Sequence, residues 1–445
     1  MSSGSSSILT SFTGALQASV AVLLTVCSGA IAAQFRLLSE SSAKDISKTC
    51  VRLFLPALLI HNVGSQLHLD TGIKYLPILI YSIAYNTLSM AAGIAMVRVF
   101  KQPGWVAPAL AFNNTTSLPL LLVQSLEATG ILASLDPSEG VVDRAKSYFL
   151  VNAMVSNSLT FALGPRMLNG QEEDAPDGGK GKSNEDEDEE DGAAEEDSED
   201  NDEQDDNDDD NDRPTEETSL LPSALVRRGQ RAASKTRARA QHHLSKLPPW
   251  ARSTLDIMYQ FLNAPLIGAV IGAIIGLTPA LHRLFFSSPQ EGGYFKAWLT
   301  AAIKNVGDLF AALQVVVVGV KLSAALVKMK QGREAGEVPW RPFAAVTAVR
   351  FVLWPLVSIP LIWVLATKTG WLGKDDPILW FAMMLMPAGP PAMKLTALAD
   401  VNGSGEQEKM SIAKFLTLSY LVSPLICFSV VGSLKASEAA VSMRQ

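Results

Sequence analysis

The sequence has few of the residues from which metal and redox sites are built. It contains three cysteines and five histidines in 445 residues. Cys27, Cys50 and Cys427 lie far apart in apolar segments, with no C-x-x-C spacing and no histidine nearby. This pattern excludes a zinc site of the usual spacing and a disulfide framework. We expect the cysteines to pack as small apolar side chains, and we expect no metal and no cofactor.

Signatures of an intramembrane enzyme are also lacking. No H-E-x-x-H motif occurs, and no aspartates are paired within an apolar segment, so the sequence disfavours an enzyme. The N-terminus has no basic region of the kind that begins a signal peptide, although residues 30–33 resemble a cleavage site. Because the apolar run is long, we expect an uncleaved first membrane span.

Acidic residues are scarce outside one stretch of the chain. Of the 44 Asp and Glu residues, 24 lie between Glu172 and Asp212, whereas 35 of the 37 Lys and Arg residues lie elsewhere. The formal net charge of -7 therefore combines a basic, apolar body with one acidic insert, which cannot form a packed core. The basic segment that follows the insert suits anionic lipid headgroups, and no nucleic-acid partner is expected, because the acidic tract would compete with it.

Apolar runs of about 20 residues, the length that crosses a bilayer as a helix, recur along the chain. We predict an all-α integral membrane protein with ten spans: 9–33, 47–66, 74–99, 105–127, 146–168, 254–277, 300–327, 342–366, 376–400 and 410–434. The predicted domains are an N-terminal five-helix membrane repeat, a disordered acidic and then basic cytosolic loop, and a C-terminal five-helix membrane repeat: 1–168, 169–252 and 253–445. An odd number of spans per half makes the halves an inverted-topology repeat.

The orientation follows from the short connections between spans. Lys and Arg are more frequent in the connections on the side of the long loop than on the opposite side. Because Lys and Arg collect on the cytoplasmic side, we expect the long loop to be cytosolic and both termini to be lumenal or extracellular.

Two of the predicted spans are interrupted by polar residues and prolines. Span four contains "NNTTSLPLLL" and span nine, its positional counterpart, contains "MPAGPPAMKL". Proline breaks the helical hydrogen-bond pattern, and non-helical backbone at membrane depth needs protein or a water-filled cavity to satisfy it. We expect Ser117 to cap a half-helix that starts near Pro119, and Gly389 to cap one that starts with Pro390 and Pro391.

Broken helices at matched positions of two halves point to a transporter's binding site, where half-helix N-termini favour an anion. The candidate substrate-binding residues are Asn113, Asn114, Thr115, Ser117, Asn152 and Lys394. Asn152 and Asn157 lie about 140° apart around a helix, so both cannot face one small ligand, and Asn152 is the preferred candidate. Alternatives remain open: a simple kink in span four, a helix–helix hydrogen bond at Asn152, and a Lys394 that snorkels or pairs with a loop.

Six stretches of the sequence resemble the auxin efflux carrier superfamily, and more closely its PIN-LIKES branch. They are "ISKTCVRLFLPALLIHNVG", "LAFNNTTSLPLLLVQSL", "YFLVNAMVSNSLTFALGPRML", "FLNAPLIGAVIGAIIGLTPAL", "NVGDLFAALQVVVVGVKL" and "MPAGPPAMKLTALA". They cover both membrane halves and exclude the long loop. The resemblance implies two five-helix inverted repeats whose broken helices four and nine cross at Asn113, Asn114, Pro119, Pro390 and Pro391. The sequence departs from the family at Lys321 and Lys394, where neutral residues are expected.

The resemblance also implies elevator-type transport of indole-3-acetic acid as its anion, in the endoplasmic reticulum membrane, with the plasma membrane as the alternative. The expected partners are a small organic anion such as indole-3-acetate, the lipid bilayer and, as an open alternative, a second copy of the chain in a homodimer. Two other functions stay open from the sequence. One is a sodium-coupled organic-anion symporter of the bile-acid type, and the other is a non-transporting membrane regulator.

Overall fold

The structure is a computed structural model of the chain, and it describes residues 8–67, 72–138, 140–169, 264–330, 339–369, 371–372, 376–401 and 406–443. Almost all of the predicted loop 169–252 and residues 254–263 of predicted span six lie outside the described residues. Every regular element in the described part is a helix, which confirms the predicted all-α class.

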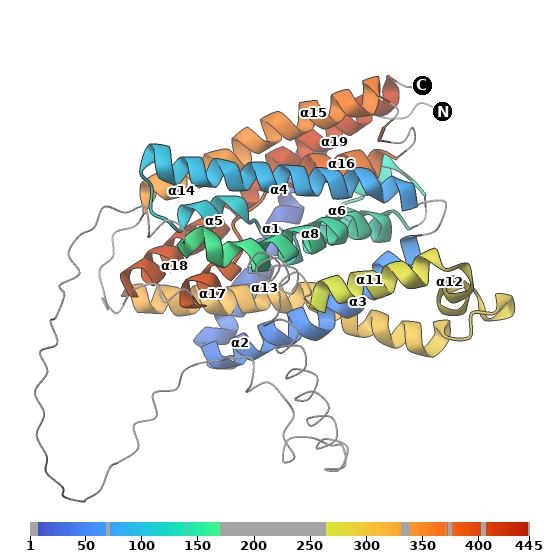
Figure 1. Ribbon diagram of the computed structural model, residues 1–445, viewed down its shortest axis with the longest axis horizontal. Helices are drawn as coiled ribbons and strands as arrows, with labels where there is room; N and C mark the ends of the chain where they lie inside the picture. The colour runs from blue at the N-terminus through green and yellow to red at the C-terminus, as the bar shows by residue number, and fades with distance from the viewer. Residues whose placement is uncertain are drawn as a thin grey trace, which may run out of the picture. The chain divides into compact units, whose positions relative to one another are not determined.

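Among the described residues, the first half of the chain contains nine helical segments (Figure 1). They are α1 (Ile8–Gln34), α2 (Glu40–Thr49), η1 (Cys50–Phe54), α3 (Leu55–Gln66), α4 (Gly72–Phe100), α5 (Val106–Ala111), α6 (Ser117–Ala128), α7 (Ile131–Leu135) and α8 (Val141–Asn169). Segments α2, η1 and α3 follow one another without a gap, so the helix at predicted span two begins at Glu40, earlier than the apolar run indicates.

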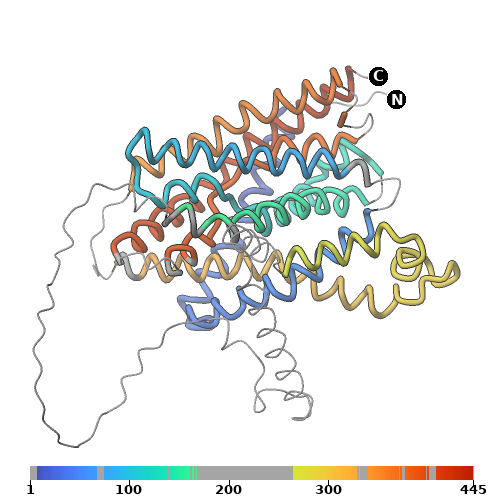
Figure 2. The backbone as a smooth tube through the Cα atoms, in the orientation of Figure 1, coloured from blue at the N-terminus to red at the C-terminus, as the bar shows by residue number. Residues whose placement is uncertain are grey.

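The second half supplies the remaining described helices. They are α11 (Ala264–Leu277), α12 (Pro279–Phe286), η2 (Pro289–Glu291), η3 (Lys296–Thr300), α13 (Ala301–Lys330), α14 (Trp340–Ala348), η4 (Val349–Leu353), α15 (Trp354–Lys368), α16 (Pro377–Leu385), α17 (Lys394–Val401), α18 (Glu406–Leu421), η5 (Ser423–Leu425) and α19 (Ile426–Ser442). Figure 2 shows helices from the two halves alternating within one bundle.

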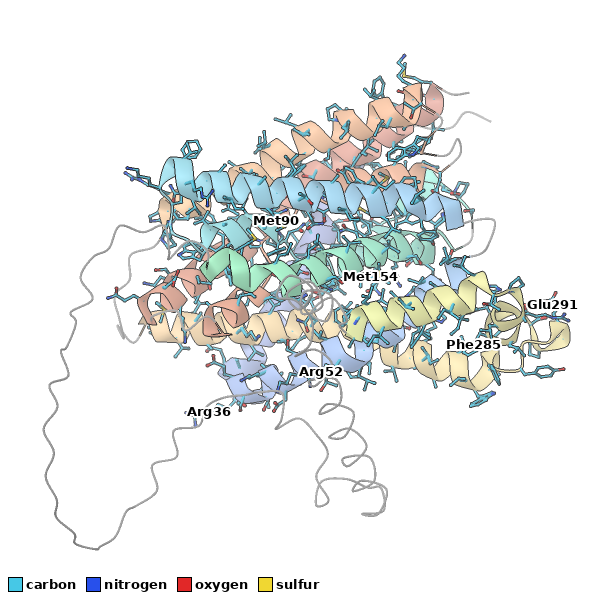
Figure 3. All side chains as sticks on the ribbon, in the orientation of Figure 1. Arg36, Arg52, Met90, Met154, Phe285 and Glu291 are labelled. Atoms are coloured by element: carbon cyan, nitrogen blue, oxygen red, sulfur yellow. The ribbon has the colours of Figure 1, made fainter. Side chains whose placement is uncertain are left out.

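Length and composition identify membrane spans directly. Among the described residues, five helices are long and apolar enough to cross a bilayer, and a sixth span is possible if α11 and α12, bent by 100°, count as one. Many large apolar side chains on α1, α4, α11 and α15 are exposed, including Leu76, Ile83, Ile274 and Leu361. Figure 3 shows side chains extending outward all along the bundle. Such faces suit lipid, and the chain is a multi-pass membrane protein.

The expectation that all three cysteines serve in packing holds for two of them. Cys50 and Cys427 are buried, whereas Cys27 is exposed on α1, and all three are free thiols. The apolar surroundings of a membrane helix tolerate a small side chain on either face, so the sequence pattern did not separate these positions.

The helices pack as two sets. The first helix set comprises α1, α2, η1, α3, α11, α12, η3 and α13, in which α1 runs along α13 and α3 runs along α11. The second helix set comprises α4, α5, α6, α8 and the segments from α14 to α19, in which α4 packs on α5 and α8, and α16 packs on α15 and α19. The two sets meet chiefly where α1 contacts α6 and α19, where α13 contacts α6 and α18, and where α3 contacts α8.

Glycine allows α1 and α13 to approach each other closely. A Cβ atom built on Gly319 would lie 1.9 Å from the carbonyl oxygen of Val26, and one on Gly29 would lie 2.0 Å from that of Val316. These separations are far below van der Waals contact, so only glycine fits at either position. The first helix set is thus held by close backbone packing.

Candidate functional site

The interruption expected in span four is present. Helix α5 ends at Ala111, residues 112–116 are not helical, and α6 begins at Ser117. Pro119 is the third residue of α6, where no helical carbonyl waits for the missing N–H, so proline fits there without breaking a bond. The polar residues that interrupt the apolar run therefore form the non-helical segment, and the proline belongs to the following helix.

The interruption expected in span nine is longer. Helix α16 ends at Leu385 and α17 begins at Lys394. Gly389 has a φ of +127°, a conformation that an L side chain rarely adopts. Pro390 and Pro391 have no N–H to donate, and both lie in extended backbone before α17.

The two interruptions meet and satisfy each other. The N–H of Asn114 donates to the carbonyl oxygen of Pro390 at 2.9 Å, and the N–H of Ala392 donates to that of Phe112 at 3.0 Å. Asn113 and Pro391 form an antiparallel bridge between them. Backbone freed by each break is thus paired with the other, as the interior of a membrane protein requires. The polar interruption of the apolar span four therefore allows the two broken helices to cross and pair here. We call the two non-helical segments, residues 112–116 and 386–393, the crossover.

Both predicted helix caps were assigned to the wrong residue. The residue that precedes α6 is Thr116 rather than Ser117, and its side chain makes no capping hydrogen bond. The half-helix after Gly389 begins at Lys394, beyond Pro390 and Pro391. The prolines lie in the crossover instead, where Pro390 accepts a hydrogen bond from Asn114 and Pro391 forms the bridge with Asn113. This pairing overrides their preference for the first turn of a helix.

Asn113 connects the crossover to the end of α16. Its Nδ2 donates to the carbonyl oxygen of Met386 at 3.1 Å and to that of Ala388 at 3.4 Å. Asn114 donates from Nδ2 to the hydroxyl of Tyr420 at 3.0 Å and lies 3.3 Å from the hydroxyl of Ser117. Both amides are buried, so each hydrogen bond replaces contact with water that the site excludes.

Arg350 also pairs with residues in and next to the crossover, and this role was not expected from the sequence. The residue is fully buried in the π-helical turn η4. Its guanidinium donates to the carbonyl oxygen of Pro387 at 3.1 Å and to that of Leu110. These carbonyls belong to the C-terminal ends of α16 and α5, where helix dipoles are negative. The single guanidinium of Arg350 therefore pairs with the C-terminal ends of both α5 and α16.

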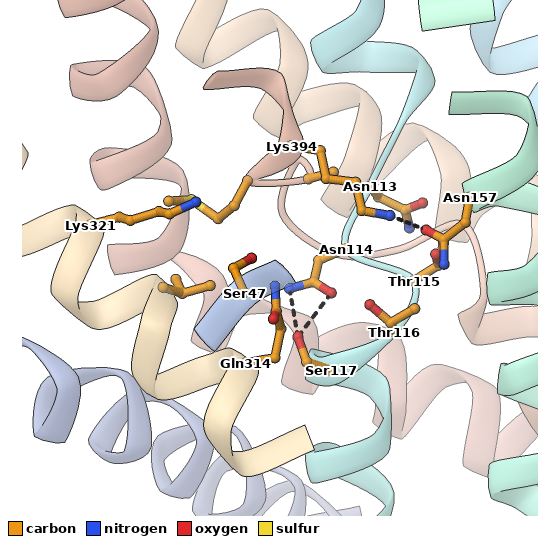
Figure 4. Close-up of a pocket in the computed structure, with 13 residues that line it drawn as sticks. Ser47, Asn113, Asn114, Thr115, Thr116, Ser117, Asn157, Gln314, Lys321 and Lys394 are labelled. Carbon is orange, nitrogen blue, oxygen red and sulfur yellow. Dashed lines mark hydrogen bonds between the residues drawn. The ribbon is translucent and has the colours of Figure 1, made fainter. Parts of the chain in front are cut away.

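A pocket of about 90 Å³ lies beside the crossover. This volume has room for several water molecules or part of one small organic molecule. Thirteen residues line it (Figure 4): Ser47, Asn113, Asn114, Thr115, Thr116, Ser117, Asn157, Gln314, Val318, Lys321, Ala392, Met393 and Lys394. The second helix set provides the crossover residues and Asn157, and the first helix set provides Ser47, Gln314, Val318 and Lys321. The pocket thus lies between the two sets.

Two of the lining residues are cationic and none is acidic. Lys394, at the start of α17, donates from Nζ to Oδ1 of Asn157 on α8. Lys321 enters from α13, on the other side of the crossover in Figure 4. The N-terminal ends of α6 and α17 both lie at the pocket, and each contributes a partial positive charge. The arrangement favours a negatively charged ligand.

The structure brings five of the six predicted binding residues to this pocket. They are Asn113, Asn114, Thr115, Ser117 and Lys394. Asn152 is not among the lining residues; its Oδ1 accepts a hydrogen bond of 2.8 Å from the hydroxyl of Tyr85 on α4. Asn157 lines the pocket in its place. Since the two asparagines lie on different faces of α8, only one of them can face the pocket.

Gln314 and Lys321 also belong to the pocket and were not among the predicted binding residues. With Val318 they occupy positions i, i+4 and i+7 of α13, which share one helix face. They interrupt the apolar run "LQVVVVGVKL" on that face alone. This helical spacing of the polar residues was the feature of the sequence from which Gln314 and Lys321 could have been predicted. Among the described residues, no group of three or more His, Cys, Asp or Glu side chains could hold a metal ion.

A cluster of charged side chains lies at the N-terminal ends of α8 and α16. Asp136, in the connection before α8, accepts hydrogen bonds from the N–H of Ser138 at 2.9 Å and from Arg144. Burial raises the pKa of Asp136, but these hydrogen bonds outweigh it and hold the pKa below its usual value. Arg144 also lies 3.9 Å from the carboxylate of Asp376, which caps α16 by accepting from the N–H of Leu379 at 3.0 Å.

Comparison with known proteins agrees with this architecture. A family model described as "Membrane transport protein" matches residues 15–429. A protein of Schizosaccharomyces pombe named as an uncharacterized transporter is 24% identical over 421 residues, which cover 92% of this chain and 91% of that protein.

Two proteins of Arabidopsis thaliana are similar over shorter segments. PIN-LIKES 7 is 28% identical over 174 residues, covering 38% of this chain and 40% of its own. PIN-LIKES 2 is 24% identical over 151 residues, covering 34% of this chain and 30% of its own. With the family model matching most of its length, the chain belongs to the membrane transport protein family, that of the auxin efflux carriers, and is a membrane transporter.

Proposed function

We propose that this transporter carries a small organic carboxylate as its anion, with indole-3-acetate (auxin) as the first substrate to test. The observation that carries the proposal is the charge of the pocket: Lys321, Lys394 and two half-helix N-termini line it, without any acidic residue. A helix N-terminus stabilises a nearby anion by about 0.3–1 kcal/mol, or up to about 2 kcal/mol when partly buried. A hydrogen bond to a charged group contributes about 1.5–3 kcal/mol. A carboxylate can use both.

The position of the pocket between the two helix sets supports an elevator-type mechanism. The first helix set is tightly packed through Gly29 and Gly319, which suits a scaffold. The second helix set carries the crossover and its half-helix N-termini. Movement of the second set along the first would carry a bound anion across the membrane while the crossover stays intact, as alternating access requires.

The packing of helices also supports ten spans in two inverted repeats. In such a repeat, exchanging the halves converts span one into span six and span two into span seven. The contact of α1 with α13 would then become the contact of α11 with α3, and both contacts are present. The pairs α4 with α5 and α15 with α16 correspond in the same way. The crossover would lie on the two-fold axis.

The endoplasmic reticulum membrane is the proposed location, with the long loop in the cytosol and both termini in the lumen. The location follows from resemblance to the PIN-LIKES branch. The orientation follows from the excess of Lys and Arg in the connections on the side of the long loop.

Uptake into proteoliposomes tests the proposal. Radiolabelled indole-3-acetate should accumulate in response to an imposed membrane potential at fixed pH, because a full charge gains about 2.3 kcal/mol per 100 mV. Benzoate and bile acids serve as competitors. An absolute requirement for a pH gradient would contradict transport driven by voltage. Loss of uptake when sodium is replaced by choline would favour the sodium-coupled symporter instead.

Substitution of Lys394 separates a transport site from a regulatory role. Lys394→Gln should lower uptake about tenfold or more, because it removes a hydrogen bond to a charged group. Lys304→Gln is the matched control, since Lys304 is exposed on α13 and does not line the pocket. Equal uptake by both variants, at equal expression, would show that Lys394 does not contribute to substrate binding.

A further inference from the structure

The pocket contains two buried acceptor atoms that an anion does not use. In the part of the chain that the structure describes, Oδ1 of Asn113 and Oε1 of Gln314 are buried without a hydrogen-bond partner. Both residues line the pocket, and Asn113 is only 3% exposed. Buried polar atoms in folded proteins are nearly always paired, with protein or with a bound molecule, so two unpaired acceptors in one pocket mark where a water molecule or a ligand would donate.

The orientation of the Asn113 amide follows from its partners. Its Nδ2 donates to the carbonyl oxygens of Met386 and Ala388. Carbonyl oxygens only accept, so the nitrogen must face them and Oδ1 must face away. The unpaired oxygen is therefore a consequence of the crossover geometry rather than of a free choice of amide orientation.

Gln314 reaches the same pocket from the other helix set. It lies on the face of α13 that also carries Val318 and Lys321, and Figure 4 shows its side chain pointing from α13 toward the crossover. Replacing Gln314 leaves the hydrogen bonds of the crossover untouched, because Asn113 makes those with the end of α16. Gln314 is therefore the better residue with which to test a donor on the ligand.

Donors and acceptors in the pocket are distinct groups. Lys321 and Lys394 are donors that suit a carboxylate, whereas the oxygens of Asn113 and Gln314 would repel one, because a carboxylate only accepts. We propose that the substrate is an organic acid that carries an N–H or O–H donor in addition to its carboxylate, and that Gln314 selects for this donor. The proposal rests on the proposed function, since it concerns the same pocket and the same anion. Indole-3-acetate carries both groups.

Two related acids that lack the N–H donor provide the probes. Benzofuran-3-acetate replaces the indole N–H of indole-3-acetate by an oxygen, and 1-methylindole-3-acetate replaces its hydrogen by a methyl group. Leaving a buried acceptor unpaired weakens an equilibrium by about 5- to 150-fold. Benzofuran-3-acetate should therefore have a KM at least about fivefold above that of indole-3-acetate in proteoliposomes of the unmodified protein.

Substitution of Gln314 then assigns the selectivity. Gln314→Met keeps the length of the side chain and removes the acceptor. The KM for benzofuran-3-acetate divided by the KM for indole-3-acetate should therefore fall to about one. The matched control is Gln124→Met on α6, because Gln124 is exposed and does not line the pocket. This control should keep the original ratio. Thermal stabilisation of the detergent-solubilised protein by each acid provides a second readout if a variant loses transport.

The outcomes are distinct. Equal KM values for indole-3-acetate and both probes in the unmodified protein would overturn the proposal and leave the proposed function standing. A KM ratio that persists in Gln314→Met would overturn the assignment to Gln314. Neither uptake of nor stabilisation by any of the three acids would overturn both this proposal and the choice of an auxin-like substrate.

Discussion

Arg350 offers the strongest test of how the crossover is held. Its guanidinium is the one described cation that donates to both incoming half-helices, through the carbonyl oxygens of Leu110 and Pro387. The perturbation is Arg350→Met, which keeps an unbranched apolar stem and removes all donors. Arg350→Lys is the companion variant, because it retains the charge but presents a single ammonium that cannot span two carbonyls as a planar guanidinium does.

The expected magnitude follows from the groups left behind. Arg350→Met leaves two buried carbonyl oxygens unpaired, at a cost of about 1–3 kcal/mol each. Removal of a buried charge returns part of this, but the guanidinium lies at the negative ends of two helix dipoles, which compensate its charge. We expect a net loss of about 2–4 kcal/mol. For a protein of this size, that corresponds to a fall in Tm of about 2–5 °C.

Thermal unfolding of the detergent-solubilised protein and uptake into proteoliposomes measure the two effects. We expect both Arg350 variants to lower the Tm, and uptake to fall at least about tenfold, because the half-helix ends lose their shared anchor. Arg341→Met is the control, since Arg341 lies exposed on α14 of the same helical run. If Arg350→Met unfolds and transports like the unmodified protein, or if Arg350→Lys restores both properties, the anchor interpretation is wrong.

Three further predictions concern the backbone and one half-buried charge. Gly389→Ala should lower the Tm through about 1–3 kcal/mol of backbone strain at a φ of +127°, and an unchanged Tm would show that the backbone there adjusts freely. Gly319→Val should separate α1 from α13 and unfold the protein at lower temperature than Ala312→Val, which alters an exposed position of the same helix. The hydrogen bonds from Ser138 and Arg144 lower the pKa of Asp136, so their stabilising effect is present above pH about 4 and is lost as pH falls through the folded-state pKa. Unfolding temperatures measured from pH 7 to 3 should show a smaller decline for Asp136→Asn than for the unmodified protein.

The sequence was sufficient to predict the two helix breaks because their constraints are local. Proline cannot donate a backbone hydrogen bond, and a cluster such as Asn113–Ser117 is costly within lipid unless protein or water pairs with it. These two facts predict a break wherever they occur together in an apolar run. Five of the residues that line the pocket were predicted in this way, because they belong to the broken segments or directly follow them.

The remaining site residues depend on contacts that a single sequence does not reveal. Arg350 resembles any basic residue near the end of a span, and only the fold brings it to Leu110 and Pro387. Asn152 and Asn157 differ only in rotation about α8, and the neighbouring Tyr85 decides which one is used for packing. The helix starts were wrong for a related reason, since Pro390 and Pro391 pair with the other half of the chain.

The distribution of the two lysines indicates how binding would be coupled to movement under the proposed function. Lys394 belongs to the second helix set and Lys321 to the first, so the pocket joins cations from two parts that must slide past each other. Without an anion these charges repel, and with one between them both are attracted to it. A bound anion would thus offset the repulsion between the two helix sets, so the second set would move past the first more readily when the carrier is loaded than when it is empty. Exchange of one labelled anion for another should therefore be faster than net uptake, and Lys321→Gln should reduce that difference. Equal rates of exchange and net uptake in the unmodified protein would show that the lysines bind the anion without coupling it to movement.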